Sequence, residues 1–571
     1  MRAPASRLLD VQAFPPPCLD VRLVETRLEQ DTSKYTALSH RWGTTATPFT
    51  TTCATLPDRA ARIPLAALPR TFRHAVRATR ALGPRYLWID SLCIVQDSAD
   101  DWAAESGRMG AIYARSHVTL AADCSGSSDG GLFSEASAVP DEEHIALDVL
   151  EAGDEGRARW CRLHVSLERE VPPNLVAMGT AGEEDGDGEE DVDRMLVTRG
   201  WTLQEAVLAP RVLHYTSKEL VWECARLGYV AVDGFSVHLR YTRPTYTEVK
   251  ERLRVKGEEG KGDAEEAMAV VRDKGGRKLT PEKLNVLIAW YFDLILLRYA
   301  TRNLTFQKDR LPAIAGLAAW TSEALQCEYI AGMWRAGLEW ALTWRKERPE
   351  KSIRQSGTDD RNIAAADATA GAELVKATSA ISRNSAEASI RHHAPSFSWA
   401  STTGQIQWDY AISTFIPTLS ISDVNLQLVD PSPFGQVYAG LDSGTWLRVE
   451  GWVTRSIVLR RKRGTPAFML PGGALCTVWL DSEREEEHDE DMRVALLELG
   501  VAAGPSEAAG GGQWWVDEGR PRNVCLLVLE EVKWATEAGS FVRKGMVEFD
   551  WDPRVLKEFR KELRWETITL F

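Results

Sequence analysis

Apolar runs alternate with amphipathic stretches through the first part of the chain. Residues 35–39, 86–90 and 118–122 are short and almost entirely apolar, which is typical of strands covered on both faces. Residues 69–82 and 99–114 place apolar side chains at helical spacing instead. Because the two patterns alternate along the chain, the sequence predicts an α/β fold in which the three strands lie side by side in a parallel sheet flanked by helices.

A second informative stretch predicts a helix over 201–208 and a strand over 212–222. Glu205 places a carboxylate in a helix whose other residues suit burial. Two interpretations stay open: the carboxylate forms a buried ion pair with Arg199 or Arg211, or it faces a cleft and takes part in chemistry.

Polar residues follow the predicted parallel strands, at the edge where ligands bind in such sheets. They are Ser39, His40, Arg41, Trp42, Asp90, Ser91, Cys93 and Asp123. A cysteine hydrolase using Cys93 and His40 is one hypothesis for this set. Cys93 stands between two apolar neighbours, however, which is more typical of a buried small residue than of a nucleophile.

Three segments resemble the successive blocks of the fungal heterokaryon-incompatibility (HET) domain. They are YTALSHRWG at 35–43, YLWIDSLCIVQDSADDWAAESGRMGAIYARSHVTLAA at 86–122 and RGWTLQEAVLAPRVLHY at 199–215. The blocks occur in the family's order, and the resemblance covers about 35–225. It implies an intracellular, cytoplasmic protein of nonself recognition and programmed cell death in fungal innate immunity.

The HET domain is in turn similar to Toll/interleukin-1 receptor (TIR) domains, some of which hydrolyse NAD with a glutamate. ALSHRWG at 37–43 looks like the first TIR strand and its exit loop, and WTLQE at 201–205 looks like the TIR helix motif that carries the catalytic glutamate. The resemblance therefore implies that Glu205 is the catalytic acid. It also implies a nucleotide cleft lined by Ser39, His40, Arg41, Trp42 and Asp90. Residues 123–200 depart from the compact TIR pattern.

Two functions are open at this point. One is a TIR-like NAD glycohydrolase, for which NAD is a substrate and no cofactor is needed. The other is a non-catalytic signalling module that assembles with partner proteins, or with copies of itself on activation, and recruits a death effector.

Composition divides the chain into four parts. The first is a HET domain over 1–235, with core blocks 35–124 and 195–225 and an acidic insertion at 178–193. A helical region over 236–345 and a linker over 346–390 follow. The last part is a β-rich carboxyl-terminal domain over 391–571, which we expect to be an antiparallel barrel or sandwich. The insertion and the linker have few apolar side chains that could pack against a core, so we expect limited proteolysis to cut there first.

Charge and cysteine usage exclude several functional classes. Two acidic runs, 181–193 and 483–491, account for the whole net charge of −14, so the remainder is nearly neutral and unsuited to nucleic acid. The nine cysteines form no CxxC pair, which argues against a disulfide framework and a zinc site. His392 and His393 have no carboxylate or cysteine cluster near them, so we expect no metal. No apolar run reaches the roughly 20 residues that span a bilayer, and no signal peptide is recognisable.

Overall fold

The computed structural model describes most of the chain, in segments. These are residues 4–28, 32, 34–43, 48–133, 144–152, 158–166, 196–216, 220–224, 228–232, 279–347, 393–409, 412, 415–429, 432–439, 443–461, 468–470, 475–481, 492–502, 523–532, 539–550 and 552–571. The predicted acidic insertion at 178–193 lies outside the described residues, as does the predicted linker from residue 348 onward. The domain boundaries proposed above remain predictions.

The amino-terminal unit is built on an eight-stranded sheet with the order β10-β9-β8-β5-β3-β4-β1-β2. The strands are β1 (Arg7–Asp10), β2 (Arg22–Glu25), β3 (Tyr35–Ser39), β4 (Tyr86–Trp88), β5 (Val118–Ala121), β8 (Arg211–Tyr215), β9 (Leu220–Cys224) and β10 (Gly228–Val232). The central strands β4, β3, β5 and β8 are parallel, and the outer strands are antiparallel. Every residue of β3, β4 and β5 is buried, so the predicted parallel arrangement of these three strands is confirmed.

Short helices surround this sheet. They are η1 (Thr26–Leu28), α1 (Leu56–Ala61), η2 (Leu65–Ala67), α2 (Arg70–Leu82), α3 (Asp90–Cys93), α4 (Ala99–Ser106), α5 (Met109–Arg115) and α7 (Thr202–Leu208). Two sequence predictions were wrong in detail. The single helix expected over 99–114 is two helices that separate at Gly107, and the single strand expected over 212–222 is the antiparallel hairpin of β8 and β9. A separate hairpin pairs β6 (His144–Ala152) with β7 (Ala158–Ser166).

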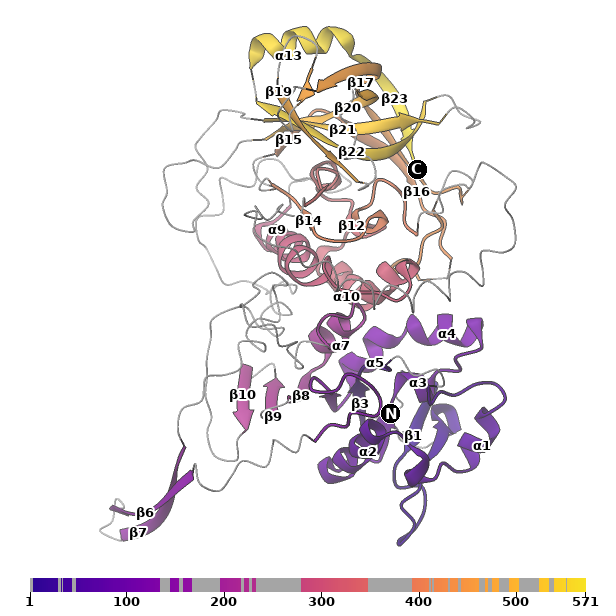
Figure 1. The fold of residues 1–571 in the computed structure, drawn as a ribbon, viewed down its shortest axis with the longest axis vertical. Helices are drawn as coiled ribbons and strands as arrows, with labels where there is room; N and C mark the ends of the chain where they lie inside the picture. Colours follow the sequence, from indigo (N-terminus) through magenta and orange to yellow (C-terminus); the bar gives the residue numbers. More distant parts are fainter. Residues whose placement is uncertain are drawn as a thin grey trace, which may run out of the picture.

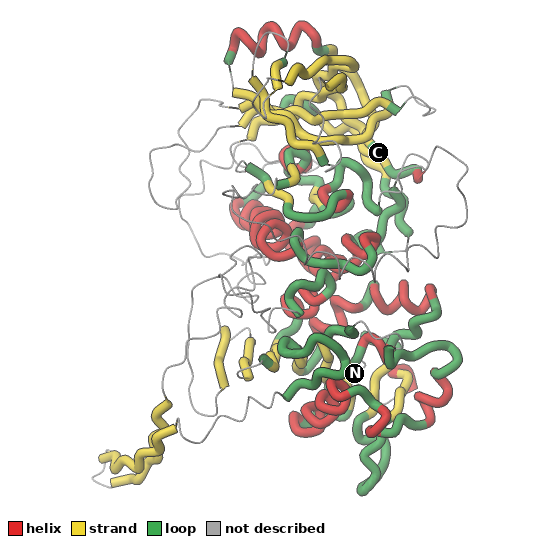
Figure 2. The backbone as a smooth tube through the Cα atoms, viewed as in Figure 1, coloured by secondary structure: helices red, strands yellow, loops and turns green. Residues whose placement is uncertain are grey.

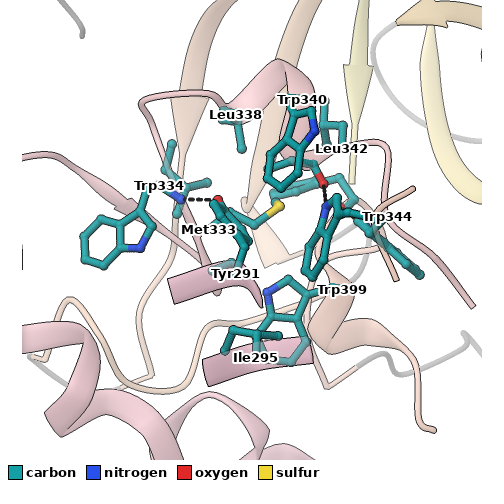
Figure 3. Packing of buried hydrophobic residues seen from close by; sticks show 14 of the residues in the cluster. Tyr291, Ile295, Met333, Trp334, Leu338, Trp340, Leu342, Trp344 and Trp399 are labelled. Carbon is teal, nitrogen blue, oxygen red and sulfur yellow. Dashed lines mark hydrogen bonds between the residues drawn. The ribbon is translucent and has the colours of Figure 1, made fainter. Parts of the chain in front are cut away.

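The helical region lies between the eight-stranded sheet and the strands of the carboxyl-terminal part (Figures 1 and 2). Its elements are α9 (Pro281–Ile288), the π-helix η7 (Ala289–Tyr299), η8 (Gln307–Arg310), η9 (Pro312–Ile314), α10 (Ala315–Leu325), β11 (Tyr329–Ile330), β12 (Met333–Trp334), α11 (Leu338–Ala341) and β13 (Arg345–Lys346). Large aromatic side chains fill its core, as Figure 3 shows around Tyr291 and Trp340. The Tyr291 hydroxyl accepts a hydrogen bond from the Trp334 backbone at 3.0 Å, so a polar group inside this core is satisfied.

The carboxyl-terminal part is a mostly antiparallel sheet. Its elements are η10 (Trp399–Ser401), β14 (Ile406–Gln407), β15 (Phe415–Pro417), β16 (Ser420–Asn425), β17 (Trp446–Arg461), β18 (Phe468–Met469), β19 (Leu475–Leu480), β20 (Met492–Ala502), β21 (Asn523–Glu531), β22 (Ser540–Asp550), α13 (Pro553–Phe559), η14 (Arg560–Glu562) and β23 (Arg564–Leu570). The pairings run β17-β20-β21-β22-β19-β18 and return to β17, which closes a ring of strands. This ring is the antiparallel barrel that the sequence offered as one of two architectures.

One buried apolar cluster contains residues from all three parts of the molecule. It begins at Leu203 and Val207 on α7, continues through the helical region at Trp290, and reaches one face of the carboxyl-terminal strands at Leu527. A second cluster lies within the parallel sheet and its helices. Helix α7 therefore belongs to the parallel-sheet unit by sequence and to the neighbouring core by packing. Within the described segments, no helix combines the length and apolar character needed to span a membrane.

Candidate functional site

Helix α7 brings Glu205 to the carboxyl end of β3. The apolar α7 side chains, Leu203 and Val207 among them, pack into the core beside the helical region. Glu205 is only 5% exposed, and the Ser39 hydroxyl donates a hydrogen bond to its Oε2 at 2.5 Å. Ser39 is the last residue of the central parallel strand. The two residues lie 166 positions apart in the chain, so the fold alone makes this contact.

The Glu205 carboxyl has a strongly perturbed acidity. Burial raises its pKa from 4.5 to about 7, and the charge of Asp90 adds to the rise. The hydrogen bond from Ser39, the charge of Arg199 and a hydrogen bond from Tyr113 oppose it. Near neutral pH the site therefore holds comparable amounts of the acid and the carboxylate, as a group that gives and takes a proton requires.

The interpretation that Glu205 forms an ion pair with Arg199 or Arg211 is wrong, since all three residues are described and no such pair is present among them. Arg199 donates to the His40 backbone carbonyl at 2.7 Å, and Arg211 donates to that of His117 at 2.9 Å. Neither guanidinium lies within ion-pair distance of Glu205 in the part of the chain that the structure describes. The buried carboxyl therefore has a hydroxyl neighbour rather than a paired cation.

His40 occupies a buried position next to Asp90. Its ring packs edge-on against Phe72 at a centroid distance of 5.0 Å, and its Nδ1 is 3.7 Å from Asp90 Oδ1. Neither ring nitrogen has a hydrogen-bond partner among the described residues. Burial lowers the His40 pKa to about 4, because it outweighs the opposing effect of Asp90, and Arg199 lowers it further. The imidazole is consequently neutral at physiological pH, and both of its nitrogens are buried.

Asp90 begins α3 and organises the loop after β3. Its Oδ1 accepts from the Ser91 backbone at 2.7 Å, and its Oδ2 accepts from Trp42 Nε1 at 2.9 Å. Arg41 is half-buried and forms no hydrogen bond or ion pair with any residue that the structure describes. Five of the six predicted site residues thus form two groups, since Glu205 contacts Ser39, while His40, Asp90 and Trp42 lie together. A single cleft shared by all six stays a prediction.

A small cavity lies beside Ser39, next to residues of β5, β8 and α7. Its volume is about 20 Å³, room for one water molecule. Ser39, Thr119, Asp123, His214 and Arg302 are among its lining residues. The cavity thus joins the predicted rim to a polar cluster on the neighbouring strands.

That cluster is a buried histidine between two carboxylates. His214 Nδ1 is 2.8 Å from Asp123 Oδ2, and its Nε2 is 3.3 Å from Glu223 Oε2. Burial acts to lower the His214 pKa, but the charges and hydrogen bonds of the two acids outweigh it and raise the pKa to about 10. His214 is therefore an imidazolium at neutral pH. Sequence reasoning named Asp123 but missed His214 and Glu223, whose meeting depends on the unpredicted hairpin.

The structure does not support Cys93 as a nucleophile. Cys93 is completely buried, and burial raises the pKa of its thiol to about 12. The reactive thiolate is therefore absent at neutral pH, which argues against the cysteine-hydrolase hypothesis.

Comparison with known proteins gives one match. Residues 35–205 match a family model described as "Heterokaryon incompatibility protein (HET)". No curated protein and no solved structure matches the chain. The matched segment contains β3, α3 and the α7 residues up to Glu205, so it includes both groups of site residues.

Proposed function

We propose that this protein, whose residues 35–205 form a HET domain, carries out its heterokaryon-incompatibility role by hydrolysing the N-glycosidic bond of NAD. The observation that carries the proposal is the contact between Glu205 and Ser39. It places a carboxyl group with a pKa of about 7 at the carboxyl end of a central parallel strand, where ligands bind in open α/β sheets.

The reaction needs a group that stabilises developing positive charge. As the bond between ribose C1′ and the nicotinamide ring nitrogen breaks, its electron pair passes to the ring, which leaves as neutral nicotinamide. The ribosyl carbon becomes oxocarbenium-like, and the ionised form of Glu205 stabilises it. A water oxygen then bonds to C1′, and the carboxylate accepts the proton that this water releases. The hydrogen bond from Ser39 holds the carboxylate in place.

Neighbouring residues suit the remainder of such a substrate. Arg41 carries a guanidinium without a described partner, which would pair with the pyrophosphate. Trp42 is half-buried and fixed by Asp90, so its ring would stack against a base. His40 offers an uncharged imidazole for hydrogen bonding. Loss of NAD would then kill the cell, which is the outcome that the HET resemblance implies.

Purified full-length protein incubated with millimolar NAD tests this proposal. Chromatography should detect nicotinamide and ADP-ribose in equal amounts, and Glu205→Gln should abolish both. Arg310→Gln is the control, because Arg310 is also buried but contacts neither Glu205 nor Ser39 in the described residues. Equal cleavage by wild type and Glu205→Gln would exclude Glu205 as the catalytic carboxylate.

A second candidate is a non-catalytic signalling module. It is favoured by the 5% exposure of Glu205 and by a neighbouring cavity with room for one water rather than a nucleotide. In that case wild type cleaves no NAD, and Glu205→Gln kills a fungal host as well as wild type does. If wild type both kills the host and depletes NAD, and Glu205→Gln does neither, the result supports the enzyme instead.

A further inference from the structure

The segment that leads into α7 is joined to the helical region through the backbone. The Gly200 amide donates to the Asn303 carbonyl at 2.9 Å, and the Asn303 amide donates to the Thr198 carbonyl at 2.6 Å. These two bonds form an isolated parallel bridge between chain segments about 100 positions apart. The start of α7 is therefore attached to a part of the chain that lies beyond the matched family segment.

Arg302 adds a side-chain connection at the same place. It is 7% exposed, and its Nη1 donates to the Arg199 carbonyl at 3.1 Å and to the Thr202 hydroxyl at 3.1 Å. Thr202 is the first residue of α7, three positions before Glu205. Arg302 also lines the small cavity next to Ser39, so it lies close to Ser39 as well as at the start of the helix that carries Glu205.

A third connection lies further along the helix. The Gly316 amide donates to Gln204 Oε1 at 3.2 Å, directly before Glu205 in the sequence. Gly316 also packs so closely on Gly110 of α5 that a Cβ atom on either glycine would be 2.6 Å from the other's Cα. Helix α7 is thus fixed at both its first and its third residue by elements of the helical region.

We infer that Arg302 is a positioning residue that, with the Asn303 bridge, holds α7 where Glu205 meets Ser39, so that the helical region completes the site of the HET domain. The inference rests on the proposed function for its catalytic consequence. It adds a regulatory one: any partner that displaces residues 302–316 from α7 would uncouple Glu205 from Ser39 without touching either residue.

Hydrogen exchange and NAD cleavage by the full-length protein test this inference together. Arg302→Gln should increase amide exchange over 203–208 about tenfold relative to wild type, since local opening of the helix becomes easier. The matched control is Arg310→Gln, another buried arginine of the same region, which donates to the Ala300 carbonyl at 3.3 Å and has no described contact with 198–204. If Arg302→Gln does not fold, Arg302→Lys keeps the positive charge but cannot bond the Arg199 carbonyl and the Thr202 hydroxyl with a guanidinium, and it should produce the same local change.

The pH profile separates positioning from general loss of structure. In Arg302→Gln the midpoint of the kcat/KM profile should move from about 7 toward 4.5, because water reaches a displaced Glu205, whereas Arg310→Gln should keep the wild-type midpoint. Exchange over 203–208 that matches the Arg310→Gln control would overturn the inference. If wild type cleaves no NAD, the proposed enzymatic function fails, and the exchange measurement alone still decides whether Arg302 holds α7.

Discussion

Replacing Glu205 by glutamine distinguishes a carboxyl whose pKa the fold raises from one that an ion pair keeps charged. The folded protein raises the pKa of this carboxyl from 4.5 to about 7, chiefly by burial. At about 1.36 kcal/mol for each pH unit, the difference corresponds to about 3 kcal/mol of folding free energy.

The sign follows from where the proton binds more tightly. The native state retains the Glu205 proton above pH 4.5, whereas the unfolded chain releases it. The contribution of Glu205 to stability is therefore fully present below pH 4.5 and is lost as the pH rises through about 7. Glutamine does not titrate, so the stability of Glu205→Gln relative to wild type should improve by about 3 kcal/mol between pH 4.5 and pH 8.

Urea unfolding followed by tryptophan fluorescence, at a series of pH values from 4.5 to 8, measures this difference. Glu105→Gln is the control: Glu105 is also fully buried in the same unit, but its carboxylate accepts from Arg108 at 2.9 Å and from the Ser6 amide at 3.2 Å. That substitution should destabilise the protein at neutral pH, because it leaves the partners of a charged group unsatisfied. A relative stability of Glu205→Gln that stays flat, or falls as the pH rises, would refute the reasoning.

Three further predictions concern other buried features. His214→Gln leaves two buried carboxylates without their cation and should destabilise the protein by roughly 3–5 kcal/mol. The His214 pKa is raised from 6.5 to about 10, so its stabilisation is fully present below pH 6.5 and is lost as the pH rises through 10. A wild-type unfolding midpoint that does not decline over this pH range would contradict the prediction. Gly316→Ala should cost about 1–3 kcal/mol through overpacking against Gly110, whereas Gly107→Ala, whose nearest neighbour would be 3.5 Å away, should be tolerated in the same thermal unfolding assay. Exposed Cys53 should react with a thiol reagent in the native protein while buried Cys93 reacts only on unfolding, and equal native rates would show that Cys93 is accessible.

The sequence predicted the centre of the parallel sheet well because burial on both faces leaves strands almost without polar residues. It failed where local signals were weak. Residues 216–219, which connect β8 to β9 in the sequence, include no glycine, proline or asparagine to indicate a reversal. The separation of α4 and α5 at Gly107 interrupts residues that suit a continuous helix.

The candidate site, like the fold, could be predicted from the sequence only in part. Glu205 was singled out because a carboxylate is unusual among apolar helix residues, and the resemblance to HET and TIR motifs linked it to Ser39. Periodicity could not do so across 166 positions. The roles of Arg302 and Gly316 depend on packing between separate parts of the chain, and nothing in their local sequence indicates that packing.

The sharing of α7 between two cores has a consequence for synthesis on the ribosome. Leu203, Val207 and Leu208 pack with residues of the helical region and the carboxyl-terminal strands, all of which are translated later. At about 5–20 residues per second, the helical region up to residue 347 follows α7 by roughly 7 to 28 seconds. During that interval this face lacks its later-translated neighbours and has contacts only with earlier elements such as α5. The nascent HET domain therefore exposes apolar side chains that the finished protein buries, and a shortened gene ending near the family boundary would leave them exposed in its final product.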